Sequence, residues 1–427
     1  MKIAIPPGVF DIIPIDDQEK WKSSYLWAHV EKIIRETARD YGYQEIRTPL
    51  FERTELFQRS VGDSSDIVSK EMYSFEDKGG RSLSLRPEGT APVIRAFIEH
   101  QLHQKASVQK LFYIAPMFRY ERAQAGRYRQ HHQFGAEVIG NASPEQDAEL
   151  IDLLYTLYQR LGLKNLTLFI NSIGDNTSRQ AFRKALKDYL APQAALLSPD
   201  SQTRLELNPL RILDSKDPRD QEIVARAPSI LNFLSEEANT HFEDLKRLLT
   251  LLRIPYQVNP LLVRGLDYYN KTVFEVVAGE LGAQNSIGGG GRYDGLLSSL
   301  GGTDLPSIGF GTGIERILQT AINQNVLMPA PDHPLLFLVA LGEKAKETSF
   351  QYLHLLRQQG IPSQMDFSNK KIGKILQYAD QIKASYVVVI GDQEIERGEV
   401  ELKEMATGNK ESIPLSTLIT TLKSKCS

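Results

Sequence analysis

The 427 residues of this chain exceed what one hydrophobic core usually holds, so the sequence predicts two or three domains. A net charge of −3 and a hydrophobic fraction of 41% are ordinary for a globular protein, and they exclude a global cationic field that attracts nucleic acid. No stretch approaches the roughly 18 apolar residues of a membrane span, and prolines interrupt the start of the chain where a signal peptide is apolar. We therefore expect a cytoplasmic protein with no membrane partner.

The residues that commonly bind metals are sparse and scattered. The single cysteine, Cys426, excludes an intramolecular disulfide and a zinc site built from several cysteines. His131 and His132 are adjacent on a predicted strand, where neighbouring side chains point to opposite faces. We therefore expect no metal held by the protein's own side chains.

The first predicted elements are a helix and a short strand. Apolar residues recur at helical spacing from Trp21 to Tyr41. A strand from Gln44 to Leu50 follows and contains Pro49, which suits the edge or the end of a sheet strand. Farther along, residues Ser82 to Thr90 predict a strand that runs into a helix, with Thr90 as the residue that caps the helix.

The stretch from Met117 to Gly140 predicts two strands around a loop with three arginines. Strand side chains alternate between faces, so Arg119 and Glu121 should share one face of the incoming strand. One face of the outgoing strand should carry His131, Gln133, Gly135 and Glu137. A solvated basic turn would explain the loop, but it would not explain why polar side chains repeat on a strand face that ought to be apolar.

The middle of the chain changes character twice. Residues from Asn171 to Arg253 are rich in leucine, alanine and charge, which predicts a helical insertion. Alternation from Tyr268 to Val277 then resumes the sheet. Two glycine-rich segments follow, Ser286 to Leu297 and Ser307 to Leu318, and the second predicts a strand that leads through glycines into a helix.

A proline-rich linker from Asn323 to Pro334 separates off a smaller domain. From Asp332 onward there are 12 Lys and Arg against 12 Asp and Glu, so this domain is neutral. Its predicted strands alternate with helices, as in an α/β domain, and span Leu335–Leu341, Pro362–Phe367, Tyr386–Ile390 and Val400–Met405. Its second predicted helix gathers Lys370, Lys371, Lys374 and Lys383, for which a solvated face is the simplest interpretation.

Several of these segments resemble motifs of the histidyl-tRNA synthetase family, which belongs to the class II aminoacyl-tRNA synthetases. The hairpin from Met117 to Gly140 resembles motif 2, and the helix and strand that end at Leu50 resemble motif 1. The run GFGTGIER, Gly309 to Arg316, resembles motif 3. LVRGLDYY, from Leu262 to Tyr269, resembles the family's histidine-specific motif almost letter for letter, and the resemblance spans nearly the whole chain.

This resemblance implies an α+β catalytic domain, with the antiparallel class II sheet flanked by helices, and a C-terminal α/β domain. The implied parts are residues 1-170 (catalytic, motifs 1 and 2), 171-256 (helical insertion), 257-325 (catalytic, with the histidine motifs and motif 3) and 326-427 (anticodon-binding). It also implies a homodimer with motif 1 at the interface. The implied reaction activates L-histidine with ATP and Mg²⁺ and transfers it to the 3′ end of tRNA(His).

The resemblance assigns catalysis to three arginines. Arg119 would hold the α-phosphate, Arg316 would stack on adenine, and Arg264 would stabilise the α-phosphate in the transition state. The chain shows no Ser-His-Asp or Cys-His set, which agrees with a phosphoryl transfer that depends on positioning and cations. The further implied contacts are Glu121 and Arg127 for ATP, and Arg122 and Gln124 for the tRNA acceptor end.

A histidine pocket is implied as well. A neutral imidazole offers one donor and one acceptor, so Glu137 and Tyr269 could bind its two ring nitrogens. Glu88 and Gln133, beside Thr90, would hold the α-amino group. The other implied pocket residues are Tyr268, Arg292 and Tyr293, with Gly288 to Gly291 letting the substrate lie against bare backbone.

Two alternatives share the same scaffold. One is the synthetase-like regulatory subunit of ATP phosphoribosyltransferase, a histidine sensor in which the catalytic arginines are lost and the C-terminal domain is missing or altered. The other is an RNA-binding or sensor module without catalysis. The presence of Arg119, Arg264, Arg316 and a C-terminal domain disfavours both, although likeness of fold alone does not establish function.

Overall fold

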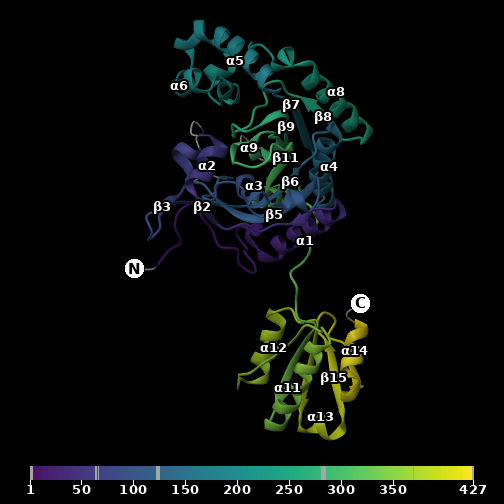
Figure 1. Ribbon diagram of the computed structural model, residues 1–427. Helices are drawn as coiled ribbons and strands as arrows, with labels where there is room; N and C mark the ends of the chain where they lie inside the picture. The colour runs from purple at the N-terminus through teal and green to yellow at the C-terminus, as the bar shows by residue number, and fades with distance from the viewer. Residues whose placement is uncertain are drawn as a thin grey trace. The chain divides into compact units, whose positions relative to one another are not determined.

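The structure is a computed structural model that describes residues 3–62, 65, 67–121, 126–279, 285–368 and 370–425. Arg122 and Gln124, the expected contacts of the tRNA end, lie outside the described residues, as does Cys426. The chain divides into two compact units, Met1–Pro329 and Ala330–Ser427 (Figure 1). Among the described residues, no helix combines the length and the apolar character that a membrane span requires.

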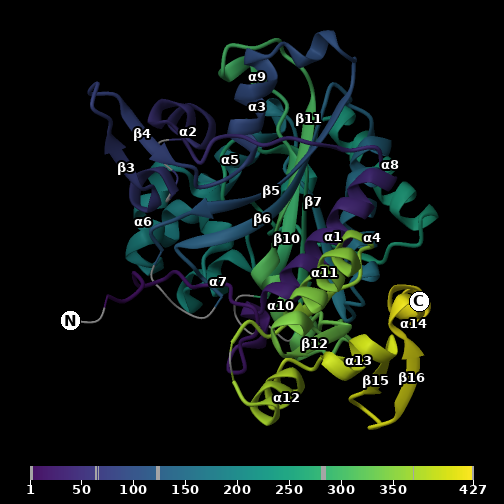
Figure 2. The same cartoon turned by 90° about the horizontal axis from the view of Figure 1, so that it is seen from below.

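An eight-stranded sheet forms the centre of the larger unit (Figure 2). In spatial order its strands are β1 (Gln44–Glu45), β5 (Gln109–Phe118), β6 (Gln130–Ile139), β11 (Ser307–Gly313), β10 (Ser286–Arg292), β9 (Asn270–Ala278), β7 (Leu166–Ser172) and β8 (Tyr256–Val258). All neighbours from β5 to β7 in this order are antiparallel, and the two edge strands pair in parallel. The predicted antiparallel sheet flanked by helices is therefore confirmed.

Helices cover one face of this sheet and leave the other for a site. The covering helices are α1 (Ser24–Asp40), α4 (Pro144–Arg160), α8 (Glu236–Leu251) and α10 (Ile314–Asn323). Phe134, Ala136 and Val138 of β6 point into the core beneath them. Because strand side chains alternate, Gln133 and Glu137 point to the opposite face, as the pattern of polar residues predicts.

Two predicted elements near the N-terminus differ from the structure. Only Gln44 and Glu45 of the predicted strand pair with β5; the N–H of Ile46 donates once more, to the carbonyl of Phe112, and the chain then leaves the sheet before it reaches Pro49. The predicted cap, Thr90, is instead the first residue of α3 (Thr90–Glu99). The carboxylate of Glu88 accepts hydrogen bonds from the backbone N–H groups of Thr90 and Ala91, at 2.7 and 2.9 Å. Glu88 therefore caps the start of this helix.

Smaller elements complete this unit around the sheet. A three-stranded sheet consists of β2 (Phe51–Arg53), β4 (Ser82–Leu85) and β3 (Ser74–Glu76). Short helical elements are η1 (Lys20–Lys22), α2 (Thr54–Val61), η2 (Ile67–Glu71), η3 (Leu102–Gln104) and α9 (Leu296–Ser299). The region expected to be helical contains α5 (Asn176–Leu190), η4 (Ala191–Leu196), α6 (Pro199–Leu207), η5 (Pro209–Asp214), α7 (Pro218–Val224) and η6 (Ile230–Phe233). We call these elements, together with α8, the helical insertion.

The smaller unit is an α/β domain around a five-stranded sheet. In spatial order the strands are β13 (Ser363–Met365), β12 (Leu336–Leu341), β14 (Tyr386–Gly391), β15 (Glu399–Glu404) and β16 (Lys410–Pro414). Its helices are α11 (Glu343–Gln358), α12 (Ile372–Gln381), α13 (Asp392–Arg397), η8 (Leu415–Thr417) and α14 (Leu418–Lys425). The sequence pattern missed α13 and β16. Of the four lysines predicted on this helix, only Lys374 lies within α12; Lys370 and Lys371 precede it, with Lys371 as its N-cap, and Lys383 follows its end.

Candidate active site

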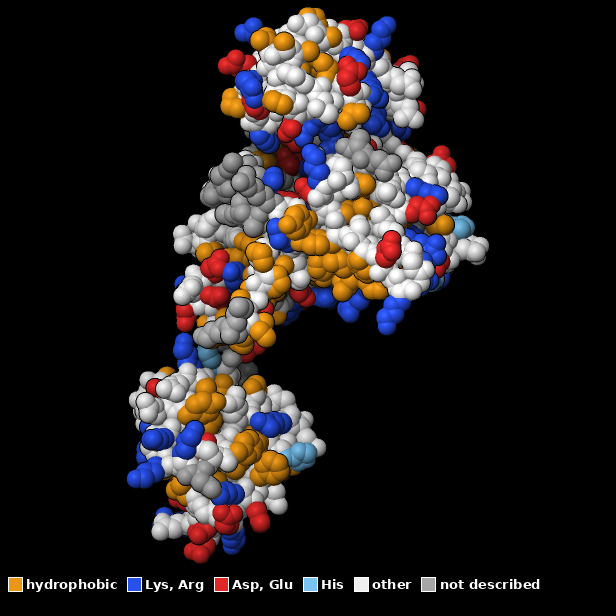
Figure 3. Space-filling view, turned by 90° about the vertical axis from the view of Figure 1, so that its left-hand side faces the viewer, with side chains coloured by type: hydrophobic (Ala, Val, Ile, Leu, Met, Phe, Trp, Pro, Cys, Tyr) orange, Lys and Arg blue, Asp and Glu red, His pale blue; other side chains and the backbone are white. Residues whose placement is uncertain are grey.

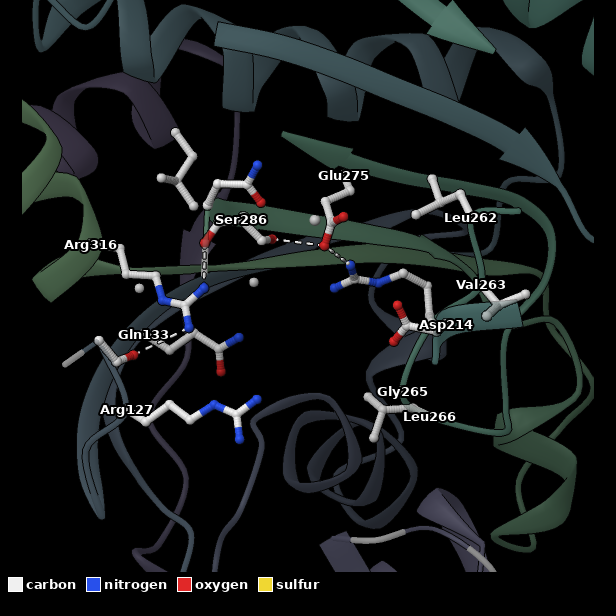
Figure 4. Close-up of a pocket in the computed structure, with 18 of the residues that line it drawn as sticks. Arg127, Gln133, Asp214, Leu262, Val263, Gly265, Leu266, Glu275, Ser286 and Arg316 are labelled. Atoms are coloured by element: carbon white, nitrogen blue, oxygen red, sulfur yellow. Dashed lines mark hydrogen bonds and ion pairs between the residues drawn. The ribbon is translucent and has the colours of Figure 1, made fainter. Parts of the chain in front are cut away.

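A pocket of about 600 Å³ lies on the polar face of the large sheet. Arg127, Gln133 and Arg316 lie on one side of it, and Asp214 and Leu262 lie on the other (Figure 4). The lining comes from segments far apart in the chain: the β5–β6 hairpin, the loop before β9, strands β10 and β11, and the end of η5 in the helical insertion. Folding is therefore required to assemble it.

Three arginines predicted to act together all line this pocket: Arg119, Arg264 and Arg316. The Nε of Arg119 donates to the carbonyl of Pro87 at 2.8 Å. Arg316, in the first turn of α10, donates to the carbonyl of Ser286 and, at 3.2 Å, to that of Gly126. These hydrogen bonds to neutral carbonyls fix the direction of the guanidiniums without tying them to a carboxylate.

Arg264 is held differently, by a carboxylate. Its Nη1 lies 2.9 Å from Oε1 of Glu275, and the hydroxyl of Ser286 donates to the same oxygen at 2.8 Å (Figure 4). Sequence reasoning missed Glu275 as a site residue. A signal existed, because a carboxylate interrupts the apolar strand Asn270–Ala278.

Arg119 and Glu121 were expected to share one face of the incoming strand, but β5 ends at Phe118, so both residues lie in the segment that follows it. Oε2 of Glu121 lies 3.2 Å from Nε of Arg127, and both residues line the pocket. The ion pair thus leaves Arg119 free to face another anion.

A buried polar cluster lies around Glu137 on β6. Its Oε1 accepts from the hydroxyl of Thr90 at 2.7 Å, and its Oε2 accepts from the hydroxyl of Tyr293 at 2.5 Å. The rings of Tyr268 and Tyr293 meet edge to face at 5.5 Å, and the ring of Tyr269 packs 4.8 Å from that of Tyr268. Burial raises the pKa of Glu137 to about 8, because no cation offsets the loss of solvent.

Glu88 and Gln133 bring further oxygens to this face of the sheet. Glu88 is buried, and burial raises its pKa. The hydrogen bonds that it accepts from two backbone N–H groups lower the pKa, but by less. The Oε1 of Gln133 is buried and has no hydrogen-bond partner among the residues that the structure describes. A buried acceptor without a hydrogen bond lowers the stability of the folded protein. This oxygen is therefore suited to accept a hydrogen bond from a ligand that brings N–H groups.

The glycines of β10 and β11 make room mainly for protein atoms. A Cβ atom at Gly309 would lie 1.6 Å from Oε2 of Glu137, and one at Gly311 would lie 1.6 Å from Nε2 of Gln133. A Cβ at Gly290 or Gly291 would meet backbone carbonyl oxygens at 2.0 and 2.4 Å. Gly288 and Gly289 line the pocket, whereas at Gly290 and Gly291 the position of a side chain is taken by neighbouring backbone.

Arg292 does not face the pocket, which corrects its expected role there. It is fully buried behind the sheet, where its Nη2 lies 2.6 Å from Oδ1 of Asp147 and its Nη1 lies 3.3 Å from Oδ1 of Asp294. The Nε2 of His241, on the helical insertion, lies 2.8 Å from Oδ2 of Asp147. This buried ion network joins α4, β10 and α8, and no local pattern in the sequence indicated it.

The two adjacent histidines point to opposite faces, as predicted. His132 lies 3.0 Å from Oε1 of Glu315, whereas His131 lines the pocket. Burial and the nearby guanidiniums of Arg119 and Arg316 lower the pKa of His131 to about 3, so its imidazole is neutral at pH 7. Within the described ranges, no three His, Cys, Asp or Glu side chains are grouped to hold a metal.

Two family models match this chain, one in each compact unit. Residues 22–317 match the family described as Histidyl-tRNA synthetase. Residues 336–425 match the family described as Anticodon binding domain. The linker between the matches includes the boundary between the two units.

Curated relatives match over nearly the full length. The chain is 73% identical to a histidine–tRNA ligase of Protochlamydia amoebophila, over 99% of this chain and 100% of the relative. It is 48% identical to a histidine–tRNA ligase of Geobacillus kaustophilus, over 98% of this chain and 97% of the relative. The same name therefore accompanies both a near relative and a more distant one.

Solved structures resemble the fold. A histidyl-tRNA synthetase from S. aureus, crystallised without ligand, superimposes with a TM-score of 0.84 at 38% identity, covering 99% of this chain and all of that one. A protein from Bacillus halodurans, described as an ATP phosphoribosyltransferase regulatory subunit/histidyl-tRNA synthetase, has a TM-score of 0.64 at 21% identity, covering 92% of this chain and 99% of that one. The second likeness concerns the fold alone.

Proposed function

This chain belongs to the histidyl-tRNA synthetase family, and from that premise we propose that it is a histidine–tRNA ligase acting through the pocket described above. It activates L-histidine with ATP and transfers the histidyl group to the 3′ end of tRNA(His). The observation that supports this most is the convergence of Arg119, Arg264 and Arg316 on one pocket beside the buried cluster of Glu137. A histidine sensor would not need three guanidiniums in one pocket.

In the first step, a carboxylate oxygen of histidine attacks the α-phosphorus of ATP. A bond forms from that oxygen to phosphorus, the bond from phosphorus to the bridging oxygen breaks, and pyrophosphate leaves with that electron pair. Negative charge spreads over the phosphoryl oxygens in the transition state. Guanidiniums that already point to these oxygens stabilise that charge without first having to move. Arg119 and Arg264 take this role on the α-phosphate, and Arg316 faces the adenine, with Glu121 and Arg127 completing the ATP site.

Selection of histidine follows from the buried cluster around Glu137. Its carboxylate, with the hydroxyl of Tyr269, presents hydrogen-bonding groups to the two ring nitrogens of the imidazole. Glu88 and the unpartnered oxygen of Gln133 take the α-amino group. Amino acids that lack the ring nitrogens leave these polar groups unpaired, which makes discrimination strong. Thr90 and Tyr293 hold Glu137 in place, and Tyr268 packs beside them.

Mg²⁺ fits the part of the pocket that would receive phosphates. This ion usually binds through one or two carboxylates together with substrate phosphates. Glu121 and Glu315 both line the pocket. Oε2 of Glu315 is buried with no hydrogen-bond partner among the described residues, and Oε2 of Glu121, which is paired with Arg127, is the other carboxylate oxygen at this place. They would hold the ion, which when bound neutralises phosphate charge.

The second step and the division of the chain follow from the same family. Residues 1-170 and 257-325 form the catalytic domain, residues 171-256 form the insertion, and residues 326-427 bind the anticodon. The match of residues 336–425 to an anticodon-binding family supports the last of these. Arg122 and Gln124 contact the acceptor end. A reaction that charges tRNA for protein synthesis supports a cytoplasmic location.

A homodimer is part of this proposal. The space-filling view shows apolar side chains gathered on one side of the larger unit (Figure 3). Exposed apolar residues near the N-terminus and on the three-stranded sheet include Ile13, Ile15, Leu50, Phe51 and Phe75. Large exposed apolar patches mark interaction surfaces. Light scattering of the purified chain measures its mass directly, and a monomer would contradict the dimer.

The test of the enzymatic function is ATP–pyrophosphate exchange by the purified chain. Exchange should depend on L-histidine and should be absent with the other amino acids. Charging of tRNA(His) should follow when the tRNA is added. Binding of histidine without any exchange would instead support the sensor alternative.

A further inference from the structure

The loop from Arg264 to Tyr269 joins the two halves of the proposed site. Arg264 lines the phosphate end of the pocket, and Tyr269 is one of the buried tyrosines near Glu137. The loop lies outside every described helix and strand. Its position therefore depends on contacts with other segments, because a sheet ladder does not fix it.

Arg211 of η5, in the helical insertion, bonds to the beginning of this loop. Its Nη2 donates to the carbonyl oxygen of Gly265 at 2.6 Å and lies 3.2 Å from Oδ1 of Asp267. The Nδ2 of Asn208 donates to the same Oδ1 at 3.1 Å. Gly265 directly follows Arg264, so the guanidinium of Arg211 restrains the backbone that carries the pocket cation.

Arg179 of α5, also in the helical insertion, bonds to the end of the loop. Its Nη1 donates to the carbonyl oxygen of Tyr269 at 3.1 Å. Strand β9 begins at the next residue, Asn270. Two arginines of the insertion thus contact the loop at separate places, one beside the phosphate end and one beside the histidine end.

We propose that Arg211 and Arg179 are positioning residues, through which the helical insertion places Arg264 for the reaction and Tyr269 for histidine. This inference rests on the proposed function of the pocket. Neither arginine lines the pocket, so each acts through the loop. Loosening the phosphate end should slow adenylation, and loosening the other end should weaken histidine binding.

The size of the effect follows from preorganisation. A guanidinium that stabilises developing charge is effective only where that charge appears, and a displacement of about 1 Å can cost roughly 10²-fold in rate. Arg211→Ala removes a restraint but leaves Arg264 in the pocket. Its loss in kcat should therefore be about 10- to 100-fold, and it should not exceed the loss in Arg264→Ala.

The decisive experiment is a double-mutant cycle in histidine-dependent pyrophosphate exchange by the full-length chain. It compares Arg211→Ala, Arg264→Ala and the variant with both changes. If Arg211 acts through Arg264, the double variant is no slower than Arg264→Ala. Losses in kcat that multiply in the double variant would overturn the proposed link. Arg211→Lys, which can still donate to the carbonyl of Gly265, should recover part of the rate.

The other end of the loop predicts a different kinetic change. Arg179→Ala should raise the KM for histidine and leave the KM for ATP unchanged. Arg183→Ala is the matched control, because Arg183 lies one turn farther along α5 and its Nη2 donates to the carbonyl of Leu207, inside the insertion, at 3.1 Å. An equal loss in Arg183→Ala would show general loosening of the insertion and overturn the proposal.

Two further outcomes separate this inference from the proposed function. A wild-type chain without histidine-dependent exchange would overturn both. An active wild type, with Arg211→Ala and Arg179→Ala equally active, would overturn the positioning role alone. Thermal melts of all variants identify any that fail to fold, and Arg211→Lys then carries the test for the phosphate end.

Discussion

At the scale of single residues, Arg264 is restrained before any phosphate is present, because its Nη1 lies 2.9 Å from Glu275. We predict that Arg264→Ala lowers pyrophosphate exchange by roughly 10²–10³-fold, as the loss of one preorganised electrostatic contact does. Histidine affinity should change little, because the charge acts mainly in the transition state. The measurement is histidine-dependent pyrophosphate exchange, and a thermal melt of the same variant shows whether it is folded. A well-folded variant with near-wild-type exchange would exclude the assigned role.

Glu137 is the second residue with a prediction of its own. The hydroxyls of Thr90 and Tyr293 hold its two oxygens, and toward the imidazole of bound histidine a carboxylate presents acceptors only, whereas an amide in its place presents a donor as well. We predict that Glu137→Gln weakens histidine binding roughly 10- to 100-fold, the cost of about 1–3 kcal/mol for a mismatched buried group. ATP binding should not change. Separate titrations with each ligand test this, and equal losses for both would indicate misfolding.

The pKa of Glu137 also predicts a dependence of stability on pH. Burial raises it to about 8 from an ordinary value of 4.5, so between these two pH values the ligand-free folded protein keeps a proton that the unfolded chain has released. Stability then falls as pH rises through this window and levels off above about pH 8. Glu137→Gln lacks this proton. The thermal midpoint of the wild type relative to Glu137→Gln should therefore decline from about pH 5 to about pH 9, and a constant difference would contradict the shift.

At this scale, the sequence predicted which residues meet but not how they bond. Alternation along β6 correctly placed Gln133 and Glu137 on the face away from the core. It could not show that Glu88 caps α3 while the hydroxyl of Thr90 turns to Glu137, because that choice depends on tertiary neighbours. Arg292 looked like a pocket residue from its motif, yet it is buried against Asp147.

At the scale of elements, the facing glycines of β10 and β11 set the space for the polar side chains. Gly309 pairs with Glu137 across the β6–β11 ladder, and a Cβ there would lie 1.6 Å from the carboxylate. We predict that Gly309→Ala displaces Glu137 and lowers histidine affinity at least as much as Glu137→Gln does, with less effect on ATP. Titration of both ligands checks this.

The control for that substitution is Gly373→Ala. Gly373 lies in helix α12, and a Cβ there would meet nothing within 4 Å. Alanine is also the better helix former, so this variant should keep or slightly raise stability. If Gly309→Ala bound histidine as well as Gly373→Ala does, the close approach of Gly309 and Glu137 would not be a requirement of the site.

Element boundaries were predicted less well than element types. β6 and β9 follow the alternation in the sequence, whereas β5 lies mostly before the stretch in which a strand was predicted, and β1 shortens to two residues. The sequence missed α13 and β16 of the smaller unit, because short segments carry little periodicity. The type of sheet depends on many strands together and was predicted correctly.

At the scale of the whole molecule, each unit has its own core. Buried residues of the smaller unit, such as Leu336, Val388 and Leu418, form a cluster separate from the clusters of the larger one. Every predicted adenylation residue lies before Pro329, the end of the larger unit. Such units commonly fold independently, since few contacts cross a linker of this composition. Adenylation and tRNA recognition should therefore be separable.

The last prediction concerns that separation. Deleting the chain from Asp332 onward should leave histidine-dependent pyrophosphate exchange detectable but severely impair charging of tRNA(His). The removed unit is neutral overall, so its RNA contacts should be local, as on the face of Lys370, Lys371 and Lys374, with a modest salt dependence. Exchange and charging are measured on one truncated protein. If both fall together while the dimer persists, the smaller unit supports the catalytic core, and if charging is undiminished, it does not bind the anticodon.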